Sequence, residues 1–257
     1  MTGVVPLLLV GDSPTEIPGC VLYYLADRLG LNNNDPVGAI PDQSGKGNSF
    51  SQGTASKKLT FKTNVVNGRA TVFADAIDDE MTANDAPDLD GNPGLTIFVV
   101  GRQTALAVSQ ALLGKWTYQT DGAWVLQTDT ATNTEMLFLV ADAAADPGNN
   151  LIKSTNLGMT TAFQVVEMVY DGSQGTAANR VKFWRNGVQA TTSMTGTVPA
   201  TLLNGGGPLL LGRFGGTLNR FYGGDFGGVA IYKRALSAPE RGRVRRWLGN
   251  YFGITVV

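Results

Sequence analysis

The chain alternates short apolar segments with glycine, asparagine and aspartate, and this alternation limits its fold more than any other feature. Each segment is about one strand long and rich in β-branched or aromatic residues. The clearest segments are Leu95–Val100, Glu135–Ala141, Ala162–Tyr170, Val181–Arg185, Pro208–Gly212 and Gly228–Tyr232. Many strands separated by turns predict an all-β sandwich or barrel. The composition agrees, because 33 glycines and a charged fraction of 16% suit strands and turns better than helices with charged outer faces.

Two local signals add detail to this outline. Asn186 and Gly187 separate two strand-like segments, and an Asn-Gly pair favours a hairpin because both positions accept a positive φ. Near the C-terminus, Ser237 and Glu240 have the spacing of a capping box and predict a helix over 237–253. Its apolar residues fall on one stripe, which predicts that the helix docks on the sandwich: Val244, Trp247, Leu248, Tyr251 and Phe252.

The N-terminal part of the chain is harder to interpret. In Pro18–Gly30 the apolar residues fall partly at helical spacing, which favours a helix, but Val21–Leu25 is also a strand-like run. Residues 1–17 are expected to form an arm, whose apolar part Thr2–Val10 either adds a strand to this domain or pairs with a neighbouring subunit. A signal peptide is disfavoured because a basic leading region is missing. No linker or repeat divides residues 18–257, which predicts one domain.

Composition excludes several chemistries. The chain has no histidine and a single cysteine, Cys20, which removes histidine-based nucleophile pairs, intramolecular disulfides and thiolate zinc clusters. A catalytic site would have to use carboxylates, lysine or tyrosine. The net charge of −1 gives no overall field for nucleic acid or an anionic membrane. No segment reaches the ~20 apolar residues of a membrane span, so we expect neither nucleic acid nor a membrane as a partner.

Four segments that follow one another along the chain match the pattern of one known family. Val37–Gln52 is similar to V-x-x-W-x-D-x-S-G-N-G, with Ile40 where tryptophan is usual. Asn67–Thr82 is similar to N-G-x-x-x-V-x-F-D-G-x-D-D-x-L. Val169–Gln189 resembles paired strands that end in Y-x-N-G, and Gly224–Ile254 resembles a closing strand and helix. Together they resemble the laminin-G-like, concanavalin A-like jelly-roll family, in the form common in bacteriophage and bacterial surface proteins.

This resemblance implies a two-sheet antiparallel jelly-roll sandwich with a short C-terminal α-helix. It also implies a binding role, because members of the family mostly bind glycans or proteins, and some hold calcium. The fold alone does not decide between these ligands, since one fold hosts unrelated functions.

The densest acidic segment contains Asp75, Asp78 and Asp79, followed by Glu80 and Asp85. Calcium takes several carboxylate and carbonyl oxygens, so the first three residues are candidate calcium ligands. The alternative is a solvated turn whose aspartates cap backbone amides. No other cofactor is expected.

Some relatives hydrolyse glycosides, a reaction that needs two carboxylates in one cleft, about 5–5.5 Å apart for retention. Alternate strand residues share a face, so a Glu-x-Asp-x-Glu strand would indicate this activity, and the chain has none. Glu167 is expected to face away from the side that Val166 and Met168 occupy. The family usually has an acidic residue at the position of Gly227 and Gly228. We therefore predict a protein that is not an enzyme.

Carbohydrate binding needs exposed aromatic rings surrounded by hydrogen-bonding groups. Trp116 and Tyr118 alternate onto one face of a strand, and Trp124 follows across a short turn. These rings, together with Tyr222 in a glycine-rich segment, are the candidate sugar-binding residues. The alternative is that aromatics in such a hairpin are cross-strand partners in the core.

The last helix has a basic side, and Arg241, Arg245 and Arg246 are candidate contacts with an acidic partner surface. The alternative is a solvated helix face, whose later arginines are favourable near the negative end of the helix dipole. Both alternatives place the three guanidinium groups at the surface.

The leading functional prediction is a bacteriophage virion protein that decorates or cements a capsid, or belongs to a tail or fibre. The phage-type resemblance, the missing secretion signal and the absence of a disulfide support it. This prediction implies synthesis in a bacterial cytoplasm, a homo-oligomer (a trimer by analogy) and major capsid or tail proteins as partners. The alternative is a lectin-like adhesion module that binds a host surface glycan, and a glycoside hydrolase is the third hypothesis.

Overall fold

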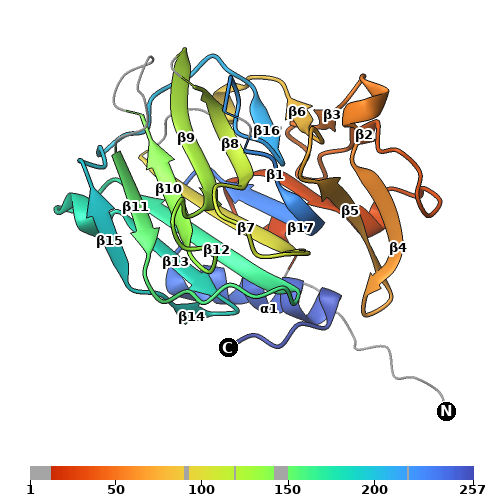
Figure 1. The fold of residues 1–257 in the computed structure, drawn as a ribbon. Helices are drawn as coiled ribbons and strands as arrows, with labels where there is room; N and C mark the ends of the chain where they lie inside the picture. Colours follow the sequence, from red (N-terminus) through yellow and green to blue (C-terminus); the bar gives the residue numbers. More distant parts are fainter. Residues whose placement is uncertain (1–12, 90–92, 119, 142–149, 219) are drawn as a thin grey trace.

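The computed structural model describes residues 13–89, 93–118, 120–141, 150–218 and 220–257. Its strands form two antiparallel sheets that pack face to face, and helix α1 (Ala238–Phe252) lies on the outer side of one of them (Figure 1). The predicted all-β jelly-roll sandwich with a short C-terminal helix is confirmed.

The first sheet carries α1 on its outer face, and eight described strands form it. In spatial order these are β14 (Val188–Gln189), β13 (Val181–Arg185), β12 (Gln164–Asp171), β7 (Gly94–Gln103), β17 (Gly223–Tyr232), β5 (Arg69–Asp75) and β4 (Thr60–Val66), with β1 (Cys20–Leu25) also paired to β17. The first half of β17 pairs with β5 and the second half with β1. Strand β17, near the C-terminus, therefore brings β1, near the N-terminus, into the first sheet.

The second sheet contains nine described strands. Their order is β15 (Thr192–Thr195), β11 (Asn150–Ser154), β10 (Met136–Val140), β9 (Asp121–Thr128), β8 (Ala111–Thr117), β16 (Leu209–Leu211), β6 (Met81–Ala83), β3 (Phe50–Ser51) and β2 (Ala39–Ile40). Five short 3-10 helices lie in the described loops: η1 (Pro14–Glu16), η2 (Ala26–Arg28), η3 (Ala55–Lys57), η4 (Pro87–Leu89) and η5 (Ala177–Asn179).

Most of the local predictions are confirmed. Each of the six segments predicted as strands contains one, namely β7, β10, β12, β13, β16 and β17. Asn186 and Gly187 have φ values of 50° and 91° and form the turn between β13 and β14. Helix α1 follows Ser237, and the chain leaves it at Gly253 with a φ of 64°.

The helix favoured for Pro18–Gly30 is wrong, because the segment forms strand β1 and the turn η2. All six residues of β1 are buried. Val21 and Tyr24 belong to the core between the sheets, whereas Tyr23 and Leu25 belong to the cluster under α1. A strand that is buried on both faces has no polar alternation, so its sequence resembles that of a buried helix.

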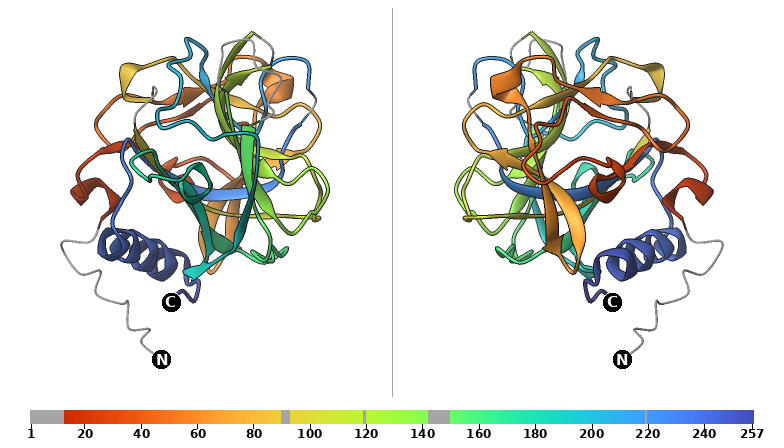
Figure 2. Two further views of the ribbon diagram at one scale, coloured as in Figure 1. Left: turned by 90° about the vertical axis from the view of Figure 1, so that its left-hand side faces the viewer. Right: turned by 90° about the vertical axis from the view of Figure 1, so that its right-hand side faces the viewer.

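The apolar interior is divided into layers. The largest cluster lies between the two sheets, and a second one lies between the first sheet and α1. In the second cluster, the rings of Tyr23 and Trp247 meet edge to face with their centroids 6.0 Å apart. Figure 2 shows α1 as a separate layer beside the sandwich. The predicted docking of the apolar helix stripe is therefore confirmed.

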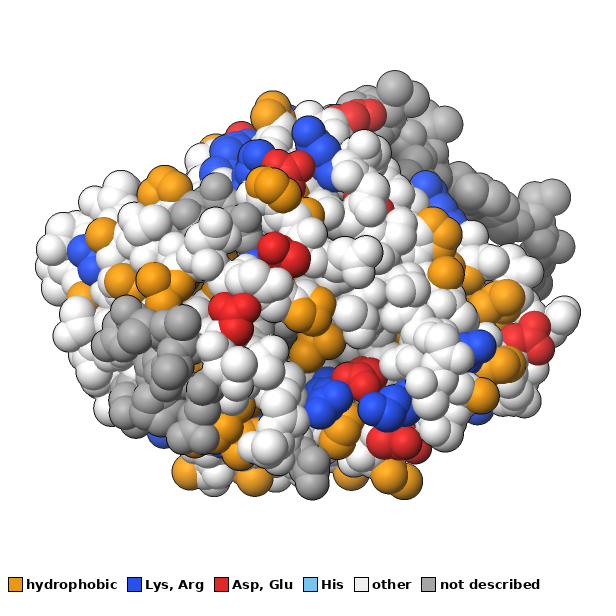
Figure 3. Space-filling view, turned by 90° about the horizontal axis from the view of Figure 1, so that it is seen from above, with side chains coloured by type: hydrophobic (Ala, Val, Ile, Leu, Met, Phe, Trp, Pro, Cys, Tyr) orange, Lys and Arg blue, Asp and Glu red, His pale blue; other side chains and the backbone are white. Residues whose placement is uncertain are grey.

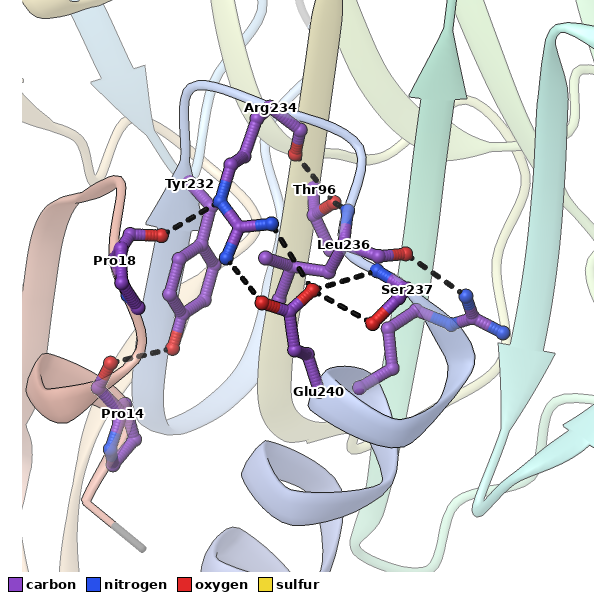
Figure 4. A network of polar contacts seen from close by, with 9 residues as sticks. Pro14, Pro18, Thr96, Tyr232, Arg234, Leu236, Ser237 and Glu240 are labelled. Carbon is purple, nitrogen blue, oxygen red and sulfur yellow. Dashed lines mark hydrogen bonds and ion pairs between the residues drawn. The ribbon is translucent and has the colours of Figure 1, made fainter.

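The loop that leads from β17 into α1 is fixed by polar contacts (Figure 4). Arg234 donates two hydrogen bonds to the carboxylate of Glu240, at 3.0 and 2.6 Å, and a third to the carbonyl of Pro18 at 2.8 Å. Glu240 also accepts hydrogen bonds from the backbone N–H and the hydroxyl of Ser237, at 2.9 and 2.8 Å. The loop therefore has a defined position before the helix begins.

Thr96 on β7 anchors the same loop from the sheet. Its hydroxyl donates to the carbonyl of Arg234 at 2.8 Å and accepts from the N–H of Leu236 at 3.0 Å. The Tyr232 hydroxyl donates to the carbonyl of Pro14 at 2.7 Å, and so ties η1 to the end of β17. Thr2–Val10, the predicted arm segment, lies outside the described residues.

Charged side chains of both signs are mixed on one face of the molecule. In the face shown in Figure 3, acidic and basic side chains lie next to one another among uncharged groups. Within the described part of the chain, none of the helices has the length and apolar character that crossing a membrane requires.

Candidate functional site

Trp116, Trp124 and Tyr222, three of the four predicted sugar-binding residues, are buried. Their exposed fractions are 1%, 1% and 2%. Trp124 stacks on Phe138 between the sheets with the ring centroids 6.0 Å apart, and Trp116 packs edge-on against Phe214 at 5.7 Å. An exposed stacking patch made of these rings is wrong, because the β8–β9 hairpin directs Trp116 and Trp124 into apolar clusters, and Tyr222, next to β17, also lies in the core. The alternative of structural aromatics holds for them.

Tyr118 is half-buried and lines a hollow of about 230 Å³ on the outer side of the second sheet. The other lining residues are Thr130, Leu137, Leu139, Leu151, Phe214, Leu218 and Arg220. Arg220 already donates to Gln127 at 3.0 Å and lies over the Phe214 ring, 5.4 Å from its centroid. Most of the residues that line this hollow are leucine or phenylalanine, so few side chains there could bond sugar hydroxyls.

Asp75, Asp78 and Asp79 come together between β5 and β6, with carboxylate oxygens within 4.8 Å of one another. Asp79 accepts the N–H of Asp75 at 3.1 Å, and Asp75 accepts the N–H of Ile77 at 2.8 Å, as in a turn capped by its own aspartates. Burial and the charges of Asp75 and Asp78 raise the pKa of Asp79 to about 7. With one oxygen from each carboxylate, this group supplies three of the roughly six to eight oxygens that calcium takes. Calcium binding here stays a prediction.

Arg241 and Arg245 face the first sheet. Arg245 donates to Glu167 on β12 at 2.8 Å, and Arg241 Nε lies 3.7 Å from the second carboxylate oxygen. The two arginine side chains are 14% and 13% exposed, and Glu167 is fully buried. Both guanidinium groups face the buried carboxylate and have little exposed surface, and their predicted contact with an acidic partner surface stays a prediction. Arg246 is exposed, and its partner contact stays a prediction.

A polar cleft of about 180 Å³ lies beside β13, between the loop after β12 and the loop before α1. We call it the β13 cleft, and it is lined by Val169, Asp171, Gln174, Asn179, Arg180, Lys182, Trp184, Gln189, Ala235, Leu236 and Arg241. Alternation along β13 creates its base. Val181 and Phe183 belong to the core between the sheets, so Lys182 and Trp184 point to the outer face.

Two charged groups of the cleft are held in place by neighbouring polar atoms. Asp171 accepts hydrogen bonds from the N–H and hydroxyl of Ser173, at 3.1 and 2.6 Å, and from the amide of Gln174 at 2.6 Å. Arg180 donates to the carbonyls of Gln174 and Val198, at 3.2 and 2.5 Å. Because the loop before α1 is also anchored, two walls of the cleft are set before any ligand enters.

Three other polar residues line the cleft without an internal partner for their side chains. Asn179, Lys182 and Gln189 are exposed, and among the described residues none of their side chains has a hydrogen-bond or ion-pair partner. The two amides offer both donors and acceptors, and the ammonium offers three donors. Such groups match sugar hydroxyls, which also donate and accept.

Trp184 forms the apolar base of the cleft. It is 6% exposed, and the Arg241 guanidinium covers its ring at 4.1 Å from the centroid. A ligand in the β13 cleft would therefore be held mainly by hydrogen bonds and charge, with little stacking on this ring. Sequence reasoning missed this site. Alternation in Val181–Arg185 indicates that Lys182 and Trp184 face outward, but no local pattern indicates the loops that meet them.

Comparison with protein families identifies the chain. The model of the Concanavalin A-like lectin/glucanases superfamily matches residues 75–240, more than half of the sequence and nearly all of the β13 cleft. The chain belongs to this superfamily. The predicted laminin-G-like, concanavalin A-like resemblance is thereby confirmed, whereas its bacteriophage form gains no support. No curated protein matches the sequence.

Several solved structures with the same fold are toxin binding domains. The binding domain of Paraclostridial Mosquitocidal Protein 1 has a TM-score of 0.60 and 11% identity, over 91% of this chain and 52% of that one. The botulinum neurotoxin serotype G binding domain has a TM-score of 0.59 and 11% identity, over 89% and 50%. The botulinum neurotoxin serotype D ligand-binding domain, in complex with N-acetylneuraminic acid, has a TM-score of 0.54 and 10% identity, over 89% and 50%. The chain thus spans about half the length of these proteins, and the likeness shows the fold alone.

Proposed function

We propose that this protein is a carbohydrate-binding module without catalytic activity, and that the sugar binds in the β13 cleft. The observation that carries the proposal is the convergence of Asn179, Lys182 and Gln189, three polar side chains without an internal partner, on one pre-formed hollow. At about 180 Å³ the cleft is smaller than the roughly 300–1,000 Å³ of sites for drug-sized ligands. We therefore expect it to hold one sugar residue of a glycan.

The comparisons support a binding role. The name of the superfamily covers lectins as well as glucanases, and the three structures of similar fold described above are binding domains, one of them in complex with a sugar. These findings favour the lectin-like alternative over the virion prediction.

The carboxylates of the cleft argue against hydrolysis. Asp171 is the one carboxylate among the described lining residues, whereas glycoside hydrolysis needs two. Asp225, which lies on β17 near the position where relatives carry an acid, is 2% exposed and bonded to Arg102 and Thr71, each at 2.9 Å. We expect incubation with glycans to release no reducing ends, and their appearance would contradict the proposal.

A glycan array followed by titration of the best ligand tests the site. Asn179→Ala and Gln189→Ala should each weaken binding about twofold to tenfold, the effect of one hydrogen bond. Both side chains are exposed, so the unfolding temperature should not change. Asn250→Ala, at the far end of α1 from the cleft, is the matched control and should bind like the natural chain. Binding that survives both cleft substitutions but is lost in Tyr118→Ala would overturn the proposed site.

The virion role stays a proposal that rests on the resemblance to phage-type sequences. It keeps the expectation of a trimer, of capsid or tail proteins as partners, and of synthesis in a bacterial cytoplasm. Imaging of an assembled particle with this chain located in it would support that role. A purified chain that stays monomeric and binds no virion protein would contradict it.

A further inference from the structure

We infer that the β13 cleft recognises an acidic sugar, whose carboxylate lies between Lys182 and Arg180. This inference rests on the proposed carbohydrate-binding function and names the class of sugar. It follows from the charges that line the cleft and from how each of them is already engaged.

The cleft carries an excess of positive charge. It is lined by three cationic residues, Arg180, Lys182 and Arg241, and by one anionic residue, Asp171. Glu167 lies fully buried beneath the cleft, where Arg241 and Arg245 both face it. One carboxylate shared by two guanidinium groups leaves that cluster with a net positive charge as well.

Asp171 does not cancel this excess. Although burial opposes it, hydrogen bonds from Ser173 and Gln174, and the charge of Lys182, lower the pKa of Asp171, so the carboxylate is ionised and occupied by internal donors. The charge of Lys182 acts on Asp171 from a distance, although no ion pair is formed between the two side chains. The one carboxylate of the lining thus stands against three cationic side chains.

Lys182 and Arg180 are available to a ligand in different ways. Lys182 is exposed and unpaired among the described residues. Arg180 is half-buried, and its hydrogen bonds go to the neutral carbonyls of Gln174 and Val198, which fix its position without neutralising its charge. A fixed guanidinium beside a free ammonium suits a carboxylate, which accepts charge-assisted hydrogen bonds from both.

A neutral sugar would fit this cleft less well. Its entry would remove water from Lys182 and Arg180 without supplying a counter-charge, which is costly for any charged group. An acidic sugar supplies the counter-charge, while its hydroxyls can still bond the amides of Asn179 and Gln189. The charge pattern therefore selects among sugars rather than merely attracting anions.

The sharpest experiment compares methyl glucuronide with methyl glucoside, which differ in a carboxylate against a hydroxymethyl group. Titration of the whole chain should show the glucuronide binding about tenfold tighter, as expected for a charge-assisted hydrogen bond. Lys182→Gln should remove this preference, and Lys182→Glu should reverse it. Raising the salt from about 0.15 M to 1 M shortens the Debye length from about 8 to 3 Å and should shrink the preference.

Lys46→Gln is the matched control, because Lys46 is an exposed lysine in the loop between β2 and β3. It should keep the preference for the glucuronide. Because Lys182 is also exposed, all three variants should keep the natural unfolding temperature, which shows that a lost preference is not lost folding.

The outcomes separate this inference from the proposed function. Equal binding of both methyl glycosides, weakened by Asn179→Ala, would overturn the inference and leave the proposed function standing. Sodium sulfate that displaces the glucuronide at equal concentration would also overturn it, since the cleft would then be a simple anion site. If neither glycoside nor any glycan of an array binds, the proposed function and the inference both fall.

Discussion

Glu167 lies on β12 with no exposed surface, and its two carboxylate oxygens face Arg245 at 2.8 Å and Arg241 at 3.7 Å. Burial raises the pKa of Glu167, and the two guanidinium groups oppose that rise. Its sequence neighbours correctly indicate that it faces away from the core between the sheets. They contain no sign of the arginines, which come from a helix more than seventy residues later. The role of Glu167 could therefore not be predicted from the sequence.

Removal of the Glu167 charge should destabilise the fold. In Glu167→Gln the two arginines keep their charges under the helix without a counter-ion, which should lower the free energy of unfolding by about 3 kcal/mol. Urea unfolding at neutral pH measures this loss. Arg246→Gln, at an exposed position of the same helix, should change the value by less than about 0.5 kcal/mol. A Glu167→Gln variant as stable as this control would refute the stabilising role given to Glu167 beside Arg241 and Arg245.

At the scale of elements, the sequence predicts strands and α1 well because their signals are local. Val181–Arg185 and the Asn186-Gly187 turn carry their own pattern, and Ser237 and Glu240 mark the start of α1. Strand β1 has no such pattern, because α1 covers one face of it and the other sheet covers the opposite face. Burial on both faces depends on the tertiary structure, so the local sequence pattern of β1 does not distinguish a strand from a helix.

The start of α1 should depend on pH through Glu240. Hydrogen bonds from Arg234, and from Ser237, lower the pKa of Glu240 to about 2, well below its value of 4.5 in an unfolded chain. Its contribution to stability is complete above about pH 5 and is lost as the pH falls through 2. Glu240→Gln should therefore cost about 1 kcal/mol at pH 7 and almost nothing near pH 2. Urea unfolding across this range measures the difference, and a cost that does not change with pH would contradict the assignment.

The contact between β17 and α1 should not tolerate a side chain at Gly227. A Cβ atom there would lie 2.8 Å from Cε1 of Phe252, whose ring is fully buried. This crowding gives a physical reason for the missing acid at a position where relatives carry one. Gly227→Ala should cost about 1–3 kcal/mol, the range for an overpacked core. Gly175→Ala, where a Cβ would meet no atom within 4 Å, is the control, and equal thermal stability of the two variants would refute the packing argument.

At the scale of the whole molecule, the fold could be predicted from the sequence but the site could not. The jelly roll follows from the strand patterns and from the four segments that match the family pattern in the same order along the chain. The β13 cleft instead combines the end of β12, the outer face of β13 and β14, and the loop before α1, which meet only after folding. The aromatic hairpin is the more conspicuous sequence feature, yet Trp116 and Trp124 are interior residues.

The central claim is that a glycan binds in the β13 cleft, and an NMR titration of the isotope-labelled chain tests it most directly. The account predicts that the best glycan shifts the amide signals of residues 171–189 and 235–241, and that Gln189→Ala reduces those shifts. Shifts centred on Tyr118 and Phe214, or no shifts with any glycan, would contradict it.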